Sequence, residues 1–442
     1  MKSGKKEIAV GLLGCGTVGS GVVKILAGRG ELIRARVGAA IRLAKVADLR
    51  PEAAAALDLA EGVFTTDAFS VARDPAIPVV VELIGGEGAA RKLILEALAL
   101  GKSVVTANKA LIASHGDELF KAAAEGGGEL FFEPAVGGAM PVIKTLRESM
   151  AGNRVESVFG ILNGTCNYIL TRMTREGISY ATALAEAKDR GYAEADPTLD
   201  VSGMDTVHKL AIVIAIAFGT RVSYGDIFVE GIERITPLDI AIAREFGYRI
   251  KLLAIAKNLG DRVEGRVHPT MIPKSDLMAA VNGAMNAVKI VGDAAGEMVL
   301  YGPGAGMMPT ASAVVSDLVD IARNSLSGAK KRVPVFAFQP RNIGSIPILP
   351  AGEVETRYYM RFAAADRPGV LSKISGALGH HGISIQSVHQ KGRKSDGAVP
   401  IVLLTHTAGE SKVRAALAEI ADLDVISGAP VLIRIEDPNE SA

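Results

Sequence analysis

Cysteine is scarce in this sequence of 442 residues, which contains only Cys15 and Cys166. Two cysteines cannot build the disulfide framework of a small secreted domain, so we expect both to be buried small side chains. An excess of charge of one sign is also missing, because 49 lysines and arginines stand against 48 aspartates and glutamates. This balance does not favour a nucleic acid or an anionic membrane as partner. Small-molecule chemistry is the function class that we expect.

Long hydrophobic runs are missing as well. The longest, residues 210–218, has about half of the roughly 20 residues that a transmembrane helix needs. The N-terminal stretch MKSGKKEIAVGLLGCG has the basic start and apolar centre of a signal peptide. Its glycines and the lack of a small-residue cleavage site favour a first strand instead. We therefore expect a cytoplasmic protein, long enough for about two or three domains with cores of their own.

A glycine motif follows the first apolar run, residues 8–13. Gly14, Gly16 and Gly19 have the spacing GxGxxG, and a helical pattern of apolar residues comes next. The motif alone is weak evidence, but here it lies between a strand and a helix. In that context the glycines allow a tight turn and let a pyrophosphate approach the helix N-terminus. The stretch therefore predicts a dinucleotide site.

Alternating strands and helices continue after this motif. A second strand, residues 42–49, carries Asp48, which suits ribose hydroxyls although it lies further downstream than the roughly 20 residues that are usual. Residues 27–38 would be the extra connection. We expect a Rossmann-type parallel sheet, with ligands at the carboxyl ends of its strands. The later elements are a strand within 78–86, a helix at 90–101 and a strand within 103–109.

The remaining chain predicts two further domains in an α/β protein. From residue 136 the pattern becomes mixed, consistent with an α+β substrate-binding and dimerisation domain. A linker rich in proline and glycine precedes a unit that reads strand, helix, strand, strand, helix, strand, the ferredoxin-like order. We expect that unit to fold separately, so that activity survives its removal. The expected ranges are 1–135 for the nucleotide domain, 136–304 for the middle domain, 305–345 packing back on the first, and 354–437 for the last.

The stretch GYAEADPTLDVSGMDTVHK, residues 191–209, collects four carboxylates and one lysine before the apolar run. One interpretation is structural: Ser202 and Asp205 match a capping box, and Asp205 with Lys209 is an i,i+4 ion pair. Asp196 precedes a proline and is interpreted as a turn residue. The other interpretation is a binding or proton-transfer site, which a structural ion-pair network can resemble.

The residues that follow Lys209 help to distinguish these two interpretations. Residues 210–218 are apolar on every face, and such a helix is normally buried all round. We therefore expect Lys209 to enter the interior. The helix N-terminus and desolvation disfavour its charge, whereas the neighbouring carboxylates favour it. Such opposing effects are what a tuned acid or base requires.

Five motifs together carry a family resemblance. The segments ELIGG, TANKALI, EPAVGGAMP, ILNGTCNYIL and GYAEADPTLDVSGMDTVHK occur in this order and resemble homoserine dehydrogenase from residue 7 to about residue 345. The tail resembles an ACT domain, a small module that senses amino acids. No kinase domain precedes the match, so the chain is similar to the monofunctional form.

The resemblance implies NAD(P)-dependent interconversion of L-aspartate 4-semialdehyde and L-homoserine. Reducing an aldehyde requires a proton for the developing alkoxide, and Lys209 is the candidate acid. Lys109 would be a second proton carrier or oxyanion-stabilising group, unless it is a surface lysine that begins a helix. The family positions assigned to the substrate are Glu194 and Asp205 for its ammonium group, Asp200 for positioning, and Gly164 and Thr165 for backbone contacts.

The resemblance also implies two bound cofactors, a dinucleotide and a monovalent cation. NAD or NADP would contact Gly14, Gly16, Thr17, Val18, Gly19, Asp48, Gly85, Thr106, Lys109, Gly191 and Gly302. Sodium or potassium would be held by oxygen atoms of Glu133, Val136, Gly138 and Met140. The alternative for this loop is a glycine-rich connector with a solvated Glu133.

The resemblance implies regulation and assembly too. L-threonine is the implied effector, with isoleucine next, held near the turn from Asp366 to Gly369 and the following helix. A dimerisation appendage without a ligand is the alternative for this unit. We expect a homodimer or homotetramer, and Asp48 predicts that NAD is at least competitive with NADP.

Two competing functions remain at this point. A non-catalytic amino-acid sensor would lack the proton-transfer residues, which are present here. Another amino-acid or semialdehyde dehydrogenase on the same fold is the closer alternative, and its acylating form would need Cys166 as nucleophile.

Overall fold

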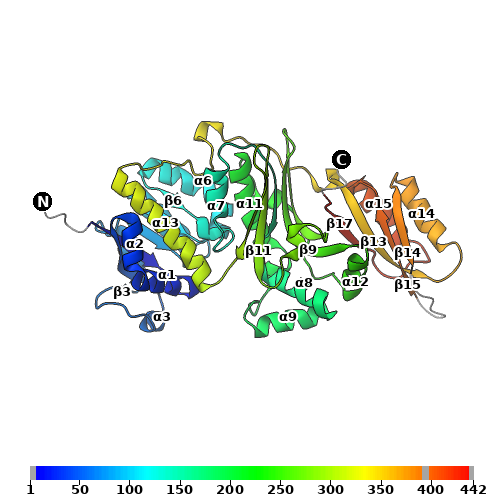
Figure 1. Ribbon diagram of the computed structural model, residues 1–442, viewed down its shortest axis with the longest axis horizontal. Coiled ribbons are helices and arrows are strands. Elements are labelled where there is room, and N and C mark those ends of the chain that lie inside the picture. The colour runs from blue at the N-terminus through cyan, green and yellow to red at the C-terminus, as the bar shows by residue number, and fades with distance from the viewer. Residues whose placement is uncertain (1–5, 391–397, 438–442) are drawn as a thin grey trace. The chain divides into compact units, whose positions relative to one another are not determined.

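The computed structural model describes residues 6–390 and 398–437 (Figure 1). The first five residues of the stretch that resembles a signal peptide lie outside this description. The chain forms two compact units and passes between them several times. The first unit comprises Met1–Gly164, Asp205–Gly225 and Met285–Ile346, and the second comprises Thr165–Met204, Asp226–Ala284 and Pro347–Ala442.

A six-stranded parallel sheet forms the nucleotide-binding part of the first unit and confirms the Rossmann-type prediction. Its strand order is β3-β2-β1-β4-β5-β6. The strands are β1 (Glu7–Leu13), β2 (Ala40–Ala47), β3 (Phe64–Thr65), β4 (Val79–Glu82), β5 (Ser103–Thr106) and β6 (Leu130–Phe131). The helices that follow them are α1 (Thr17–Gly28), α2 (Gly30–Val37), α3 (Pro51–Ala55), α4 (Ala68–Arg73), α5 (Ala89–Ala99) and α6 (Lys109–Gly126). The predicted extra connection is therefore largely the helix α2.

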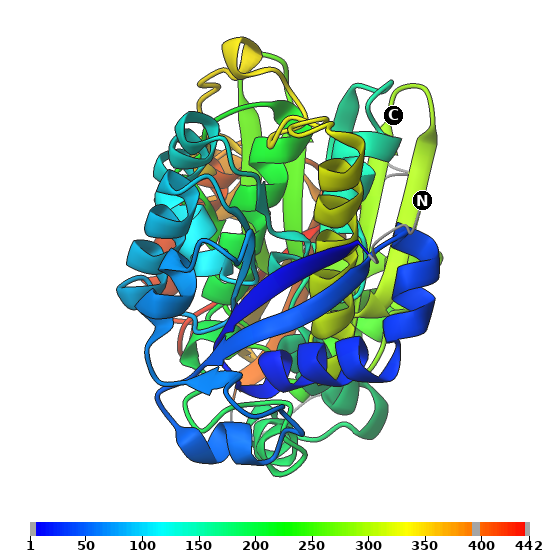
Figure 2. The same cartoon turned by 90° about the vertical axis from the view of Figure 1, so that its left-hand side faces the viewer.

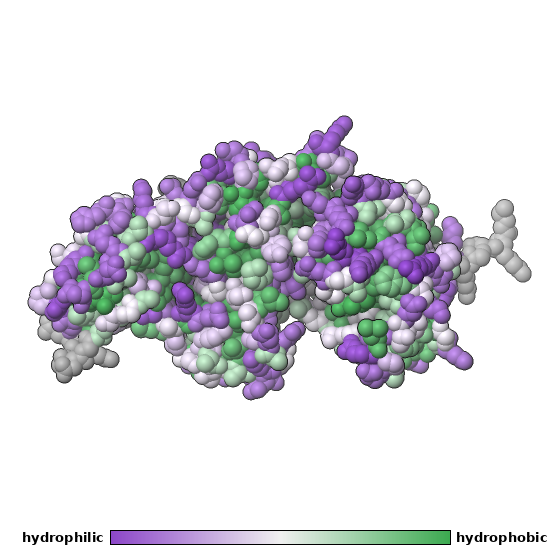
Figure 3. All heavy atoms as spheres, turned by 180° about the vertical axis from the view of Figure 1, so that it is seen from behind, coloured by the Kyte–Doolittle hydropathy of each residue, from purple (hydrophilic) through white to green (hydrophobic). Residues whose placement is uncertain are grey.

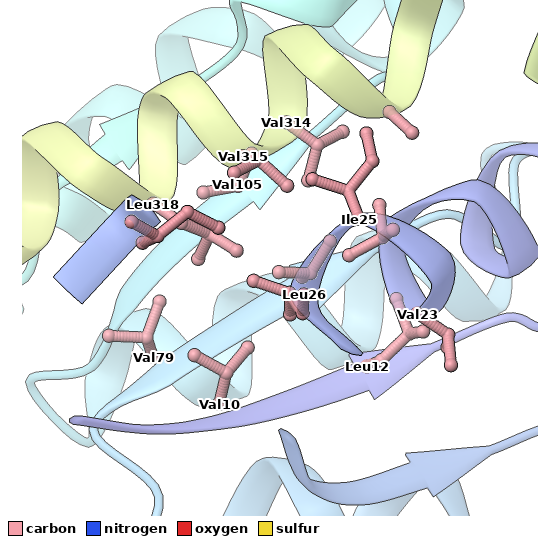
Figure 4. Packing of buried hydrophobic residues seen from close by; sticks show 14 of the residues in the cluster. Val10, Leu12, Val23, Ile25, Leu26, Val79, Val105, Val314, Val315 and Leu318 are labelled. Carbon is pink, nitrogen blue, oxygen red and sulfur yellow. The ribbon is translucent and has the colours of Figure 1, made fainter. Parts of the chain in front are cut away.

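One long helix returns to this sheet from far along the chain. The helix α13 (Met307–Ser327) packs on α1 and on β1, β4 and β5, as expected for the segment 305–345 (Figure 2). Gly21 on α1 makes the approach possible, because a Cβ there would lie 2.7 Å from the carbonyl oxygen of Met307. The shared core is shown in Figure 4, where the labelled side chains are Val10, Leu12, Val23, Ile25, Leu26, Val79, Val105, Val314, Val315 and Leu318.

The rest of the first unit holds three antiparallel strands and one fully apolar helix. The strands run in the order β12-β11-β7. In α11 (Met204–Phe218) every residue from Leu210 to Phe218 is buried, as its composition predicts. The other elements are η1 (Glu133–Ala135), α7 (Val142–Lys144), the π-helix η2 (Thr145–Ser149), β7 (Val155–Ile161), β11 (Met285–Gly292), β12 (Gly296–Pro303) and η5 (Pro340–Asn342).

The second unit begins with helices and a long antiparallel strand pair. The strands β9 and β10 pair over their whole length, from Tyr248 opposite Pro273 to Asn258 opposite Val263. The elements are α8 (Gly164–Glu176), α9 (Tyr180–Asp189), α10 (Thr198–Val201), η3 (Tyr224–Asp226), β8 (Phe228–Val229), α12 (Pro237–Glu245), β9 (Tyr248–Asn258), β10 (Val263–Pro273) and η4 (Leu277–Ala280).

The C-terminal part of this unit has the predicted ferredoxin-like order. Its strands lie in the sequence β17-β13-β15-β14, and each neighbouring pair is antiparallel. A core of its own forms around Tyr358, Phe362 and Ile374. The elements are η6 (Ala351–Glu353), β13 (Glu355–Ala365), α14 (Val370–His380), β14 (Ile385–Gln390), β15 (Ala398–Thr405), β16 (Ala408–Gly409), α15 (Glu410–Ala421) and β17 (Val431–Ile435).

The expectation that residues 354–437 fold separately stays a prediction, but the module also contacts the rest of its unit. The strand β17 pairs with β10, placing Arg434 opposite Thr270. Buried charges cross the same boundary: the Arg361 guanidinium donates to the Asp239 carboxylate at 2.6 and 3.1 Å, and Asp239 has no exposed surface. The sequence pattern of the module is complete within itself, so it could not predict these long-range pairings.

The surface carries both kinds of side chain. Figure 3 shows hydrophilic residues spread over one face, with smaller hydrophobic areas between them. In the described residues we find no helix that combines the length and the hydrophobicity needed to cross a bilayer.

Candidate functional site

The predicted dinucleotide loop has the geometry that its three glycines suggest. Gly14 has φ +103°, and a Cβ on it would lie 2.7 Å from the carbonyl oxygen of Leu83. A Cβ on Gly19 would lie 2.0 Å from the carbonyl oxygen of Gly14, whereas the space beside Gly16 is open. Gly16 also caps α1 without a side chain, ahead of Thr17. First-turn N–H groups lack partners within a helix, so this open approach fits a pyrophosphate.

Asp48 lies directly after β2 and is fixed beside this loop. Its carboxylate accepts the backbone N–H of Cys15 at 2.7 Å and that of Arg50 at 3.0 Å. Burial opposes ionisation, but these bonds and the Arg50 guanidinium outweigh it and lower the pKa of Asp48. The Arg50 side chain is 62% exposed and lies 3.3 Å from the carboxylate. The end of β2 therefore carries charges of both signs: the Asp48 carboxylate, which is held in place, and the Arg50 guanidinium, which is accessible.

Glu82, at the end of β4, is a residue that the sequence interpretation missed. It has no exposed surface and accepts the Thr106 hydroxyl at 2.6 Å and the backbone N–H groups of Ile84 and Gly85 at 2.8 and 2.9 Å. Gly85 itself has φ +79° with open space beside it. The carboxylate thus shapes the turn that carries Gly85. Its position at the carboxyl end of a parallel strand was the signal that could have found it.

Asn108 was also missed, and it sets the start of α6. Its side-chain oxygen accepts the backbone N–H of Leu111 at 3.2 Å, and its amide nitrogen donates to the carbonyl of Gly86 at 2.7 Å. The hydroxyl of Thr106 accepts its backbone N–H at 3.0 Å. The first helical residue after this cap is Lys109. The cap therefore fixes the direction in which Lys109 leaves the sheet.

The structure brings Lys109 and Lys209 together on one carboxylate. Lys209 Nζ lies 2.7 Å from Asp205 Oδ2, and Lys109 Nζ lies 2.9 Å from Asp205 Oδ1. Asn163 donates to Asp205 Oδ2 at 2.9 Å. Lys209 is 8% exposed, which confirms its predicted burial, and the Lys109 side chain is 38% exposed. Lys109 begins a helix as the structural interpretation proposed, but its ammonium group is in the cluster.

Asp205 is the centre of this cluster rather than a helix cap. The helix α11 begins at Met204, so Gly203 and not Ser202 precedes it, which makes the capping-box interpretation wrong. Burial alone would raise the pKa of Asp205, but the two lysines outweigh it and hold the pKa well below its usual range. A carboxylate that stays ionised keeps both ammonium groups oriented.

Lys209 has the donor geometry of a proton-transfer group. Besides Asp205, its Nζ donates to the carbonyl oxygen of Leu162 at 2.7 Å. An ammonium group has a further N–H donor, which can meet a substrate oxygen. The arrangement can therefore deliver a proton to an oxygen atom and recover it, within a cluster that is largely shielded from water.

The other predicted substrate residues belong to the second unit. The Thr165 hydroxyl lies 2.6 Å from the carbonyl oxygen of Tyr192 and 3.3 Å from Asp200 Oδ2, which ties the start of α8, at Gly164, to the acidic stretch. Glu194 is exposed on the loop before α10. Gly191 has φ +72° with open space beside it.

The structure confirms Asp196 as a turn residue and both cysteines as buried. Asp196 accepts the N–H and the hydroxyl of Thr198 at 3.1 and 2.6 Å. Cys166 Sγ donates to the carbonyl of Asp200 at 3.2 Å, which favours the neutral thiol over a nucleophilic thiolate. For Cys15, burial and the nearby Asp48 raise the thiol pKa to about 11. Neither cysteine has the surroundings of an acylating enzyme's nucleophile.

The predicted cation loop is compact, and its glutamate is not solvated. Glu133 is 3% exposed and accepts the backbone N–H groups of Ile143 and Lys144 at 2.9 and 2.8 Å, so the alternative of a solvated Glu133 is wrong. Burial raises the pKa of Glu133 to about 7 despite these bonds. Gly138 has φ +58°, and a Cβ on it would lie 2.8 Å from the carbonyl oxygen of Pro303.

The donor set of this loop suits a hard monovalent cation. Val136 has no exposed surface, and the carbonyl of Met140 accepts the N–H of Val142 at 2.8 Å with a lone pair remaining. Gly302 approaches the same loop, since a Cβ on it would lie 3.1 Å from Met140 Cγ. Over residues 6–390 and 398–437, no three or more His, Cys, Asp or Glu side chains gather as metal ligands.

Comparisons with known proteins cover nearly the whole chain. The family model described as homoserine dehydrogenase matches residues 141–319, its NAD-binding domain matches residues 14–133, and the ACT domain matches residues 358–425. A homoserine dehydrogenase from Pseudomonas aeruginosa is 47% identical, with 98% of this chain and 100% of the relative covered. One from Neisseria gonorrhoeae is 44% identical, with coverage of 98% and 99%.

Solved structures give the same match. The crystal structure of a homoserine dehydrogenase from Thiobacillus denitrificans is 48% identical, with a TM-score of 0.93 and coverage of 98% of this chain and 99% of that one. A hyperthermophilic archaeal homoserine dehydrogenase in complex with NADPH is 25% identical, with a TM-score of 0.60 and coverage of 71% and 97%.

Proposed function

Because the chain belongs to the homoserine dehydrogenases, which are NAD(P)-dependent oxidoreductases, we propose that it interconverts L-homoserine and L-aspartate 4-semialdehyde. The family resemblance drawn from the sequence motifs is thereby confirmed. The observation that supports the residue roles is the cluster of Lys109, Lys209 and Asp205. The alternatives of a non-catalytic sensor and of an acylating dehydrogenase lose their basis with this membership.

Lys209 is the proposed proton donor. A bound nicotinamide supplies the hydride to C4 of the semialdehyde in reduction and accepts it in oxidation. Lys209 Nζ gives its proton to the oxygen on C4 as the aldehyde becomes an alcohol, and takes it back in the reverse reaction. Lys109, which shares Asp205 with it, replaces the proton or stabilises the developing oxyanion.

The carboxylates of the acidic stretch are the proposed partners of the substrate's ammonium group. Glu194 is exposed, so its carboxylate is accessible to the ammonium group of an incoming substrate. Asp205 contributes as well, while it orients the two lysines. Asp200, held by Thr165, positions the loop, and the backbone of Gly164 and Thr165 completes the contact.

Coenzyme choice is the first test of this proposal. With purified protein, we expect L-homoserine to be oxidised with both NAD and NADP. We expect kcat/KM for NAD to be at least comparable to kcat/KM for NADP. Asp48 suits ribose hydroxyls and repels a 2′-phosphate, whereas Arg50 can hold that phosphate. Steady-state rates at 340 nm measure both reactions.

Arg50→Ala provides the control for this test. It should lower kcat/KM for NADP and leave that for NAD nearly unchanged. A hundred-fold preference of the wild type for NADP would show that the interpretation of Asp48 is wrong. If the enzyme oxidises homoserine with neither NAD nor NADP, the proposed reaction is wrong.

A bound sodium or potassium ion is proposed at Glu133, Val136, Gly138 and Met140. Removing small cations should loosen this loop, which packs against Pro303 and carries Glu133 next to α7. We expect enzyme dialysed into tetramethylammonium chloride to lose activity and to regain it with NaCl or KCl. Ionic strength is held constant as the control. Equal rates in all three salts would argue against a functional cation.

L-threonine is the proposed effector of the ACT domain, with isoleucine next. The turn between β13 and α14, where Gly369 has φ +87°, offers backbone N–H groups to an amino acid. We expect millimolar threonine to inhibit homoserine oxidation by the full chain. Asp366→Ala, on that turn, should weaken inhibition and leave the uninhibited rate unchanged. If no amino acid changes the rate of homoserine oxidation, the ACT domain has only a structural role.

Assembly and location complete the proposal. A homodimer or homotetramer is expected from the family, and sedimentation equilibrium measures the subunit number. A cytoplasmic enzyme is proposed from its small-molecule substrate and its two free cysteines.

A further inference from the structure

A segment near the end of the first unit, residues 333–346 and called the strap below, is fixed at both of its ends. At its start, the Arg147 guanidinium donates to the carbonyl oxygen of Pro334 at 3.1 Å. At its end, the backbone N–H of Gly344 donates to the carbonyl oxygen of Gly219 at 2.8 Å. Between these points the strap bends back on itself, and Ala337 has φ +62°, which is uncommon for a residue other than glycine. The strap is thus an arch tied down at two places.

A cavity of about 570 Å³ lies beneath this arch. Phe120 from α6 and Phe131 from β6 line it from below, and Phe336 and Phe338 line it from the strap. The rings of Phe120 and Phe336 meet edge to face, with centroids 4.5 Å apart. Close-packed interiors rarely leave such space, whereas small-molecule sites span roughly 300–1,000 Å³. None of the residues assigned above to coenzyme, substrate or cation lines this cavity.

The charges in the cavity wall favour an anion. Of its two acidic side chains, Asp117 lies 3.4 Å from the Arg221 guanidinium. The other, Glu129, accepts the backbone N–H of Lys331 at 2.9 Å. The basic side chains that line the wall outnumber these two acids, since they are Lys121, Arg147, Arg221 and Lys331, and Arg147 is only 9% exposed.

Arg147 is the group best suited to hold an acid. Its Nε and one terminal nitrogen donate to the carbonyl oxygens of Pro334 and Val333, which leaves further N–H donors on the guanidinium. Burial lowers the pKa of Arg147, and the nearby carboxylates of Asp317, Glu148, Glu133 and Glu129 counter this only in part, so a further anion would favour the charged guanidinium. A planar guanidinium matches a carboxylate in two parallel hydrogen bonds.

We propose that the cavity under the strap is a second ligand site, which binds a small organic acid with an aromatic or branched aliphatic body. The carboxylate pairs with Arg147, and the body packs among the rings of Phe120, Phe131 and Phe336. Binding holds the strap against α6 and β6, so the strap's backbone opens less often when the site is filled.

The experiment uses the full chain and 4-phenylbutanoate as the probe. Calorimetric titration should show saturable binding, and hydrogen exchange of residues 333–346 should slow in its presence. The charge-reversed probe 4-phenylbutan-1-amine should bind at least about tenfold more weakly, since a hydrogen-bonded charge pair contributes roughly 1.5–3 kcal/mol. Arg147→Met should weaken binding of the acid by a similar factor.

Two further variants separate the site from general effects. Lys121→Met removes a cation that also lines the cavity but is 74% exposed and lies 3.9 Å from Glu125, which does not line it, so affinity for the acid should stay within about twofold. Val335→Trp fills the cavity from the strap and should abolish binding even if Arg147→Met fails to fold. The rate of homoserine oxidation is measured for each variant to check that the enzyme is still folded.

Four results would overturn the proposal: no binding of the acid, equal binding of acid and amine, unchanged binding by Val335→Trp, or displacement of the acid by NAD(P) or homoserine. A change in subunit number on binding would also overturn it, because a second copy of the chain would then cover this face.

Discussion

Lys209→Ala is expected to lower kcat for homoserine oxidation by about 10²-fold or more, while affinity for the coenzyme stays nearly unchanged. The physical reason is the position of its ammonium group, which is buried and held 2.7 Å from both Asp205 Oδ2 and the carbonyl of Leu162. A water molecule in the place of the Lys209 ammonium group would not be held in the orientation that proton transfer requires. Steady-state rates give kcat, and quenching of protein or coenzyme fluorescence gives coenzyme affinity.

Two variants control for the loss of a buried lysine as such. Lys102 is 5% exposed and donates to the carbonyl of Asp74, outside the carboxylate cluster, so Lys102→Met should keep a near wild-type kcat. Asp205→Asn should raise KM for homoserine, because a proposed partner of the substrate's ammonium group is removed, and should lower kcat as well, because both lysines lose the charge that orients them. A wild-type rate for Lys209→Ala would exclude it as the proton donor, and a selective effect of Asp205→Asn on NAD(P) affinity would argue for a structural role.

Local sequence patterns predicted the parts of the site that depend on neighbours along the chain. The glycine spacing predicted the turn before α1 because two of its requirements are local: Gly14 has φ +103°, and a Cβ on Gly19 would lie 2.0 Å from the carbonyl oxygen of Gly14. The burial of Lys209 followed from the nine apolar residues after it, which leave the helix no exposed face. The strand and helix alternation likewise predicted the parallel sheet.

Contacts between distant residues could not be predicted in this way. Lys109 and Asp205 lie 2.9 Å apart but are separated by nearly one hundred residues, so only the family resemblance placed both in one site. The burial of Glu133 depends on backbone N–H groups about ten residues downstream, at the start of a very short helix. Glu82 was overlooked because a single carboxylate at the end of a strand has no spacing pattern.

The C-terminal module shows that a local pattern can be complete and still omit contacts to the rest of the chain. Its strand and helix order is complete, and this completeness suggested independence. Yet β17 extends the sheet through β10, and Arg266, which is 1% exposed, pairs with Glu436 near the chain end as well as with Glu264 on its own strand. Ion pairs of this kind leave no trace in hydrophobic periodicity, since each member is an ordinary charged residue in its own segment.

Truncation after Gly352 is therefore expected to yield a protein whose second unit is less stable than in the full chain. The cut removes Arg361 and Tyr359 from the buried Asp239, and Glu436 from the buried Arg266. Leaving one buried charge unpaired costs about 3–5 kcal/mol, and a native domain is stable by only about 5–15 kcal/mol. Arg266 keeps its bond to Glu264 and Asp239 keeps that from the Thr236 hydroxyl, so the cut costs less than two fully unpaired charges. Together with the uncovered edge of β10, it should still lower the stability of the second unit. Solubility and thermal denaturation of the 1–352 fragment measure this.

Point variants of the full chain test the same cause without removing the module. Arg361→Met should lower Tm strongly because Asp239 stays buried and charged, and adding Asp239→Asn should recover part of the loss. Arg367→Met is the matched control: its partner Asp424 is 62% exposed and its own side chain 53%, so Tm should hardly change. A 1–352 fragment with wild-type Tm and activity would show that the module is independent after all. In that case the charges between β10 and β17 would serve regulation and not the stability of the fold.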